Sequence, residues 1–149
     1  MGTLKGKTAI ITGGGRAVLS DGSCGSIGYG IATAYAKEGA NLVITGRNVK
    51  KLTDAKEELE EKYGIRVLPV QADISAGADN EALAESVAKQ AMDAFGRIDV
   101  LINNAQASAS GVTLADHTTE QFDLAVYSGL YATFHYMKAC YPYLKETKG

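Results

Sequence analysis

Glycine residues cluster near the start of the chain, between two segments with different hydrophobic patterns. The first segment, Thr8–Thr12, is a short apolar and β-branched run that predicts a strand, and the second, Ile27–Glu38, carries Ala, Ile and Tyr at helical spacing. The glycines of Thr12–Gly15 follow the strand, and those of Ser26–Gly30 open the helix. Glycine allows a tight turn and close backbone approach, and a helix N-terminus attracts anions. This order predicts a dinucleotide site with its pyrophosphate at the helix, although glycine-rich turns without a ligand are also common.

Basic side chains follow the first and second predicted strands, where a dinucleotide with an additional phosphate group would carry its extra negative charge. The run Asn41–Thr45 predicts the second strand, and Gly46 and Arg47 follow it, with no acidic residue to hold a ribose diol. A guanidinium at this position can bind a 2′-phosphate through two charge-assisted hydrogen bonds, and Arg16 in the first loop is a second candidate for the same anion. The pattern favours NADP over NAD. The alternative is that Arg47 only begins a solvated helix.

An acidic residue, Asp73, follows the third predicted strand, Arg66–Gln71. In an open parallel sheet, the loops at the carboxyl ends of the strands line the ligand crevice. Asp73 could therefore accept a hydrogen bond from an adenine amino group, with Ile74 beside the base. Asp is also an ordinary residue at a helix N-terminus, and that is the alternative interpretation.

Two amides, Asn103 and Asn104, stand at the end of the fourth predicted strand, Val100–Asn103. Side-chain amides both donate and accept hydrogen bonds, so they can connect adjacent strands or bind a ribose. We expect Asn103 to connect neighbouring strands, and we expect Asn104 and Ala105 to lie near the cofactor.

The segments between the strands have helical patterns. The last of them begins with a capping box in which Gln121 follows Thr118 at the required spacing. The predicted helices are Ile27–Glu38, Val49–Tyr63, Asn80–Phe95 and Thr118–Lys145. Strands that alternate with such helices predict an α/β fold of the Rossmann-like, doubly wound type with a parallel sheet. Only four strands are predicted. We therefore expect residues 1–149 to be the NADP-binding N-terminal portion of a longer domain, with this portion ending before the fifth strand of that domain.

Composition argues against several classes of protein. The 149 residues include 15 basic and 17 acidic side chains, a net charge of -2 that gives no reason to expect a nucleic-acid partner. No apolar run is long enough to span a membrane, and no secretory segment accompanies the two cysteines, Cys24 and Cys140. We therefore expect a cytoplasmic protein that binds neither nucleic acid nor membrane and has no disulfide framework.

No set of residues forms a recognisable catalytic or metal-binding group. His117 and His135 lack Cys or carboxylate partners at metal-ligand spacing. Ser108, Ser110 and Ser128 have no nearby base and no nucleophile-elbow motif. Tyrosines are concentrated in the last helix, and we expect them to pack in a core or at an interface, against a further part of the protein or another subunit; they are Tyr127, Tyr131, Tyr136, Tyr141 and Tyr143.

Taken together, the motifs resemble the short-chain dehydrogenase/reductase family, and the resemblance covers the whole chain. The residues that carry it are Thr12-Gly13 with a delayed Gly28, Arg47, Asp73 and Asn103-Asn104-Ala105. Longer stretches are similar to the bacterial NADP-dependent 12α-hydroxysteroid dehydrogenases; these are SIGYGIATAYAKEGANLVITGRN, LINNAQASASG and YSGLYATF.

The resemblance implies reversible hydride transfer between NADP and the 12α-hydroxyl of a bile acid or related steroid, by a homotetramer. The serine and the Tyr-x-x-x-Lys pair that catalyse this step in the family would lie beyond Gly149, so no catalytic residue is expected within this chain and the isolated chain is expected to be inactive. The candidate cofactor-binding residues are Gly13, Gly15, Arg16, Ser26, Ile27, Gly28, Arg47, Asn48, Asp73, Ile74, Asn104, Ala105 and Gln106.

Several positions depart from the family pattern. The loop Ala17–Gly25 is additional and either covers the cofactor or protrudes, and Ser26 stands where a glycine is common. Gln106 replaces the last glycine of the Asn-Asn-Ala-Gly motif, and Gly129 stands where the family has a helix asparagine, which puts a proton relay through that asparagine in doubt. The segment Gln106–Ser110 could instead reach the substrate pocket.

Two other functions fit parts of the sequence. A nucleotide-binding or interaction module without catalysis fits the missing catalytic residues. An enoyl-ACP reductase-like enzyme fits the stretched first loop that ends in Ser26-Ile27, but Asn103-Asn104-Ala105 argues against it.

Overall fold

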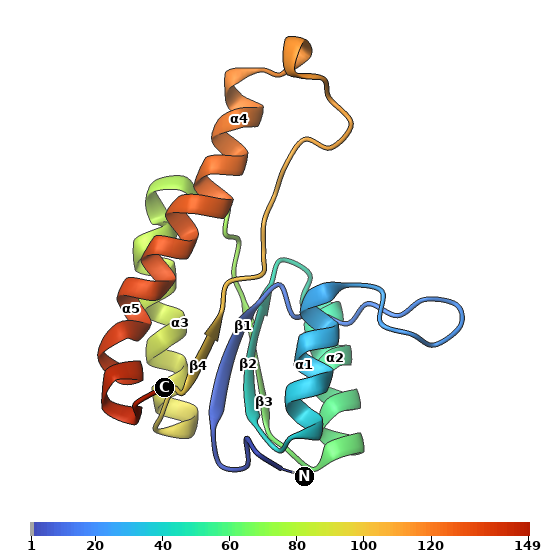
Figure 1. The fold of residues 1–149 in the computed structure, drawn as a ribbon, viewed down its shortest axis with the longest axis vertical. Coiled ribbons are helices and arrows are strands. Elements are labelled where there is room, and N and C mark those ends of the chain that lie inside the picture. The colour runs from blue at the N-terminus through green and yellow to red at the C-terminus, as the bar shows by residue number, and fades with distance from the viewer. Residues whose placement is uncertain (1) are drawn as a thin grey trace.

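A computed structural model describes residues 2–149, apart from the side chain of Ala78. Four parallel strands form one sheet in the order β3-β2-β1-β4, covered by helices on both faces (Figure 1). The strands are β1 (Thr8–Thr12), β2 (Asn41–Gly46), β3 (Val67–Gln71) and β4 (Val100–Ile102). The helices are α1 (Ile27–Lys37), α2 (Val49–Tyr63), α3 (Asn80–Phe95), α4 (Thr119–Ala125) and α5 (Ala132–Thr147). The predicted α/β fold with a parallel sheet is confirmed.

Two hydrophobic cores lie on opposite faces of the sheet, because successive side chains of a strand point in opposite directions. Ala9 and Ile11 of β1 pack with α1 and α2, whereas Ile10 packs with α3 and α5. Every residue of β1 is buried, as expected for a strand in the middle of a sheet that is covered on both sides. This central position fixes the loop that follows β1 among the ends of its neighbours.

Three strand ends differ from the prediction by one residue, and at one of them β2 continues to Gly46 instead of ending at Thr45. β3 begins one residue later, because the backbone N–H of Arg66 donates to the side chain of Asn41 at 3.0 Å instead of joining the ladder. β4 ends at Ile102, so Asn103 lies outside the strand and is exposed. The side-chain bond of Asn41 to Arg66, which periodicity does not report, accounts for the later start of β3.

The last helical segment is not one uniform α-helix. It begins with the predicted capping box of Thr118 and Gln121, but a π-helical turn, Val126–Tyr131, joins α4 to α5. The prediction of a single helix ending at Lys145 is therefore corrected: the segment changes type in the middle and continues to Thr147. A π-turn admits one extra residue per turn without breaking the hydrophobic stripe, so the apolar spacing alone does not reveal it.

The additional loop Ala17–Gly25 forms a short hairpin that protrudes from the side of the molecule (Figure 1). At its neck, the N–H of Gly25 donates to the carbonyl of Ala17 at 2.7 Å, and Val18 pairs with Cys24 in an antiparallel bridge. At its tip, Asp21 accepts hydrogen bonds from both the N–H and the hydroxyl of Ser23. Of the two expectations for this loop, the structure supports protrusion.

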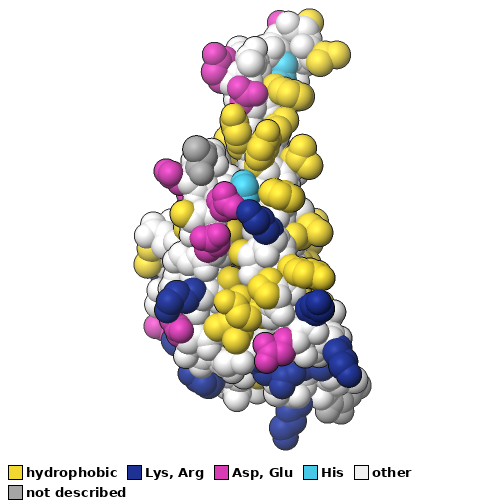
Figure 2. All heavy atoms as spheres, turned by 90° about the vertical axis from the view of Figure 1, so that its left-hand side faces the viewer, with side chains coloured by type: hydrophobic (Ala, Val, Ile, Leu, Met, Phe, Trp, Pro, Cys, Tyr) yellow, Lys and Arg dark blue, Asp and Glu magenta, His cyan; other side chains and the backbone are white. Residues whose placement is uncertain are grey.

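The tyrosines of the last helical segment face two ways. Tyr136 is fully buried and Tyr143 packs at the edge of the core, whereas Tyr127, Tyr131 and Tyr141 are exposed. Figure 2 shows hydrophobic side chains along this side of the molecule. The other exposed large hydrophobic residues between residues 114 and 141 are Leu114, Phe122, Leu130, Phe134 and Met137. Core packing is thus confirmed for two of the five tyrosines.

Candidate functional site

A crevice lies across the carboxyl ends of the strands, where the loops after all four strands meet. β1 and β4 are neighbours there although the chain joins them through the other two strands, and open α/β sheets bind ligands at such a switch point. The crevice is lined by Gly13, Arg47, Ala72, Asp73, Ile74, Asn104, Ala105, Gln106 and Ala107. All of these except Ala72 and Ala107 are candidates from the sequence.

Glycine is required at two places beneath this crevice. Gly13 has a φ of +75°, in the left-handed region that favours glycine. A Cβ atom at Gly28 would lie 2.1 Å from the carbonyl oxygen of Gly13 and 2.5 Å from the side-chain nitrogen of Asn104. The N-terminus of α1 therefore packs directly on the turn after β1, which brings the positive end of the helix to the crevice.

The hydroxyl of Thr12 connects β1 to the loop after β4. It accepts hydrogen bonds from the N–H groups of Asn104 and Ala105, each at 3.0 Å, and donates to the carbonyl of Ile102 at 3.4 Å. In return, Nδ2 of Asn104 donates to the carbonyl of Thr12 at 3.0 Å. Asn104 is therefore the amide that connects the strands, and the expectation that Asn103 would do so is wrong.

Arg47 lies at the open side of the crevice, with an exposed side chain. Its backbone is fixed by Gln71, whose Nε2 donates to the Arg47 carbonyl at 3.1 Å. Oδ1 of Asp73 accepts hydrogen bonds from the hydroxyl and the N–H of Ser75, at 2.6 and 3.0 Å. The Ser75 hydroxyl is the main reason that the pKa of Asp73 lies below its usual value, and Arg47 lowers it further, while burial opposes both. The crevice therefore presents an ionised carboxylate near an accessible guanidinium.

The remaining candidates lie beside the crevice rather than in its lining. Gly28 supports its floor, Ser26 caps α1 by accepting the N–H of Tyr29 at 3.3 Å, and Ile27 is 77% exposed. A Cβ at Gly15 would lie 3.2 Å from Cβ of Lys51, against the first turn of α2.

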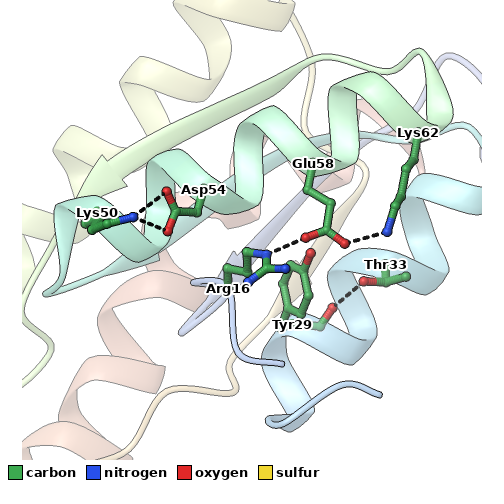
Figure 3. Close-up of polar contacts among 7 residues, drawn as sticks. All are labelled: Arg16, Tyr29, Thr33, Lys50, Asp54, Glu58 and Lys62. Atoms are coloured by element: carbon green, nitrogen blue, oxygen red, sulfur yellow. Dashed lines mark hydrogen bonds and ion pairs between the residues drawn. The ribbon is translucent and has the colours of Figure 1, made fainter. Parts of the chain in front are cut away.

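Arg16 and Asn48 line a separate hollow between the hairpin and the first turn of α2. Asn48 caps α2 by accepting the N–H of Lys51 at 3.0 Å. The guanidinium of Arg16 is paired with the carboxylate of Glu58 on α2 (Figure 3). The structure therefore does not bring Arg16 into the same crevice as Arg47.

The loop after β4 is held against the π-turn. The hydroxyl of Ser128 accepts the N–H of Ala107 and donates to its carbonyl, both at 2.9 Å. The side chain of Gln106 lies over Gly129, where a Cβ atom would be 3.5 Å from its Nε2. The two departures from the family pattern, at 106 and 129, are thus neighbours in space.

The π-turn is also held from α3. Asn80 is fully buried, and its Nδ2 donates to the carbonyl of Tyr127 at 3.3 Å. Asn80 and Ala107 thus bind two successive residues of the turn, Tyr127 and Ser128.

Across residues 2–149, no three His, Cys, Asp or Glu side chains come together as a metal-binding group. No helix in that range combines the length and the hydrophobicity needed to cross a bilayer.

The model of the short chain dehydrogenase family matches residues 7–149. This chain belongs to the short-chain dehydrogenase family. The family expected from the motifs is confirmed.

Individual relatives agree with this assignment. A 12α-hydroxysteroid dehydrogenase from a Clostridium species is 61% identical over 149 residues, which are 100% of this chain and 55% of that protein. Among solved structures, L-sorbose reductase from Gluconobacter frateurii complexed with NADPH and L-sorbose has a TM-score of 0.83 at 28% identity, over 99% of this chain and 51% of that one. An alcohol dehydrogenase from the archaeon Thermococcus sibiricus complexed with 5-hydroxy-NADP has a TM-score of 0.82 at 29% identity, over 96% and 55%. The short-chain dehydrogenase chain described here thus spans about half the length of these relatives.

Four side chains hold the loops and helices around the site through partners that the sequence alone does not reveal: Thr12, Glu58, Gln71 and Ser128. Each binds a group distant along the chain, so local patterns carry little information about its partner. Thr12 gave one usable signal, because it is a polar residue at the carboxyl end of the central strand.

Proposed function

We propose that this chain is the NADP-binding part of a hydroxysteroid dehydrogenase that interconverts a 12α-hydroxyl and a 12-oxo group on a bile acid or related steroid. The observation that supports it most is the crevice that brings Gly13, Arg47, Asp73 and Asn104 together at the ends of four different strands. The 61% identity to a 12α-hydroxysteroid dehydrogenase supports the substrate class. Because the chain spans about half of that relative, the activity is proposed for the whole protein.

The residues of the crevice fit NADP. The turn at Gly13 and the N-terminus of α1 offer backbone N–H groups and a positive helix end to the pyrophosphate. Arg47 would bind the 2′-phosphate through its guanidinium, and Asn104 and Ala105 would lie beside a ribose. Oδ2 of Asp73 makes no hydrogen bond within residues 2–149, so it is able to accept one from the adenine amino group. NADP supplies or accepts the hydride when it is bound.

We propose that the end of the crevice at Gln106 faces the substrate side of the cofactor. Gln106 lines the crevice, and its side chain lies over Gly129 of the π-turn. Its amide would contribute a polar contact in the region that Gln106–Ser110 forms, and most of the apolar steroid surface would need further walls.

The cofactor assignment is tested by equilibrium titration of the purified protein with NADPH and NADH. Arg47→Ala is expected to weaken NADPH binding about tenfold while changing NADH binding little, because it removes charge-assisted bonds to a group that only NADPH carries. Arg66→Ala, which removes an exposed arginine far from the crevice, is the matched control. An unchanged ratio of the two affinities in Arg47→Ala would show that Arg47 does not bind the 2′-phosphate.

The substrate assignment is tested by following NADPH formation with steroids that carry one hydroxyl each. A 12α-hydroxysteroid is expected to be oxidised, and its 3α- and 7α-hydroxy counterparts are not. NADP binding without oxidation of any of them would instead support a nucleotide-binding module without catalysis.

Assembly and location follow from the family resemblance. We propose a cytoplasmic homotetramer for the intact protein, and the hydrophobic surface along α4 and α5 offers one face for contacts between subunits (Figure 2). A monomeric mass in light scattering at micromolar concentration would exclude the tetramer.

A further inference from the structure

The carboxylate of Glu58 on α2 is bound by basic side chains from two sides (Figure 3). Its Oε2 accepts a hydrogen bond from Nε of Arg16, and its Oε1 accepts one from Nζ of Lys62 at 2.6 Å. The side chain of Glu58 is 21% exposed, compared with 39% for Arg16 and 58% for Lys62. Glu58 is thus the least accessible member of a cluster that joins α2 to the loop after β1.

The charges of this cluster are fixed at neutral pH. The hydrogen bonds from Lys62 and then Arg16 lower the pKa of Glu58 to about 2, against the opposing effect of burial. The hydroxyl of Tyr29 points toward the same carboxylate (Figure 3), and burial, followed by Glu58, raises its pKa to about 12. Glu58 is therefore ionised and Tyr29 neutral, and the two basic groups leave one positive charge in excess.

Arg16 is held at two points and retains free donors. Its backbone N–H donates to the carbonyl of Lys51 at 2.8 Å, and its Nε is bound to Glu58. Within residues 2–149, its two terminal Nη groups make no hydrogen bond. Arg16 also borders the hollow that contains Asn48, the residue after Arg47. An arginine with unused donors therefore shares this hollow with the N-cap residue of α2.

We propose that Glu58 is a positioning residue: it orients Arg16 so that the free Nη groups meet the 2′-phosphate of NADP, and so contributes to the preference for NADP without touching the cofactor. The inference rests on the proposed NADP binding. Arg16 would approach the phosphate from the hollow, and Arg47 would approach it from the crevice. An arginine that is already held in one conformation loses less side-chain entropy on binding a phosphate than a free one, so the orientation itself strengthens binding.

Titration of the purified protein with NADPH and NADH tests this role. Glu58→Ala is expected to weaken NADPH binding about fivefold, with NADH binding changed less than about twofold, because only NADPH carries the 2′-phosphate. Arg16→Ala is expected to weaken NADPH binding at least as much. The Arg16→Ala/Glu58→Ala double variant is expected to bind NADPH as tightly as Arg16→Ala alone, because Glu58 acts through Arg16.

Lys62→Met is the matched control, because it removes the other ion pair of Glu58 and leaves the Arg16 contact in place. It is expected to leave the ratio of the two affinities unchanged. Glu58→Gln keeps the size of the side chain and an acceptor oxygen for Nε, so it provides a folded variant if Glu58→Ala unfolds, and its effect on the ratio is expected to be smaller and of the same sign.

Three results would overturn the proposal: an equal loss of NADPH and NADH binding in Glu58→Ala and Glu58→Gln, a stronger preference for NADPH in either variant, or an unchanged ratio in Arg16→Ala. The first would assign Glu58 to structure alone, and the second would mean that Glu58 competes with the phosphate. If any of these three results is accompanied by a changed ratio of NADPH to NADH affinity in Arg47→Ala, the proposed NADP binding still stands.

Discussion

The loops after β1 and β4 both border the crevice, but they are held in different ways. The β1 loop is fixed mainly by its backbone: the N–H groups of Gly13 and Gly14 donate to the carbonyl of Thr45 at 2.9 and 3.1 Å. The β4 loop is fixed by side chains, the hydroxyls of Thr12 and Ser128. The loop held by its backbone requires glycine where a side chain would clash. The loop held by side chains requires particular polar groups.

The largest expected effect comes from adding one carbon atom to the β1 region. Gly28→Ala places a Cβ 2.1 Å from the carbonyl oxygen of Gly13, so α1 must move away from the turn. We expect a loss of about 3 kcal/mol or more in the free energy of unfolding, and loss of NADPH binding. Urea unfolding followed by circular dichroism measures the first effect.

Gly30→Ala is the matched control for that substitution. Gly30 lies on the same helix, and the nearest atom to its added Cβ would be Cβ of Cys24, at 3.8 Å. We expect this variant to be as stable as the wild type or up to about 1 kcal/mol more stable, because alanine favours a helix more than glycine does. Equal destabilisation by the two substitutions would refute the close packing of α1 on the turn.

A smaller loss is expected when the hydroxyl that holds the β4 loop is removed. Thr12→Val keeps the size of the side chain but leaves the N–H groups of Asn104 and Ala105 without their acceptor, which is expected to cost about 2 kcal/mol. Thr33→Val, which removes a hydroxyl bonded to the carbonyl of Tyr29 within α1, is expected to cost less than about 1 kcal/mol. If both variants unfold at the same urea concentration, Thr12 does not hold the loop.

The second hydroxyl of the β4 loop is expected to have a local effect. Ser128→Ala removes both hydrogen bonds to Ala107 and is expected to reduce stability by about 1 kcal/mol. Amide hydrogen exchange at Ala107 should accelerate by about tenfold or more, while exchange at Gly13 stays unchanged. Ser86→Ala, on the exposed side of α3, is the control. Faster exchange in both loops would mean that they are not held independently.

The smallest effect concerns acid stability. The pKa of Glu58 is lowered from 4.5 to about 2 in the folded protein, so its contribution to stability is fully present above pH 4.5 and disappears as the pH falls toward 2. Glu58→Gln is expected to reduce the slope of stability against pH in this window, and Glu57→Gln, an exposed neighbour on α2, is expected to retain the wild-type slope. An identical slope in Glu58→Gln and the wild type would contradict the ion pairs at Glu58.

The sequence predicted the β1 region better than the β4 region, and the reason is physical. The turn at Gly13 follows from a local order of strand, glycines and helix, and Arg47 and Asp73 follow from their positions at strand ends. These features depend on residues that are close together along the chain. The parallel sheet followed in the same way, from the alternation of strands and helices.

The β4 region could not be predicted to the same depth. Asn103 and Asn104 are equivalent in sequence, and only the approach of Thr12 from a distant part of the chain decides that Asn104 makes the connection. The π-turn depends on contacts from Asn80 and Ala107, which no pattern within the last helix reports. The ion pair of Arg16 with Glu58 likewise joins residues 42 positions apart.

The most direct test of the proposed dinucleotide site is a ¹H–¹⁵N NMR titration of the isotopically labelled protein with NADP⁺ and, separately, with NAD⁺. We expect both ligands to shift the backbone amides of Gly13, Asn104 and Ala105, and NADP⁺ alone to shift those of Arg47 and Asn48 strongly. Shifts confined to other surfaces, such as the exposed side of α5, would contradict a dinucleotide site at the carboxyl ends of the strands.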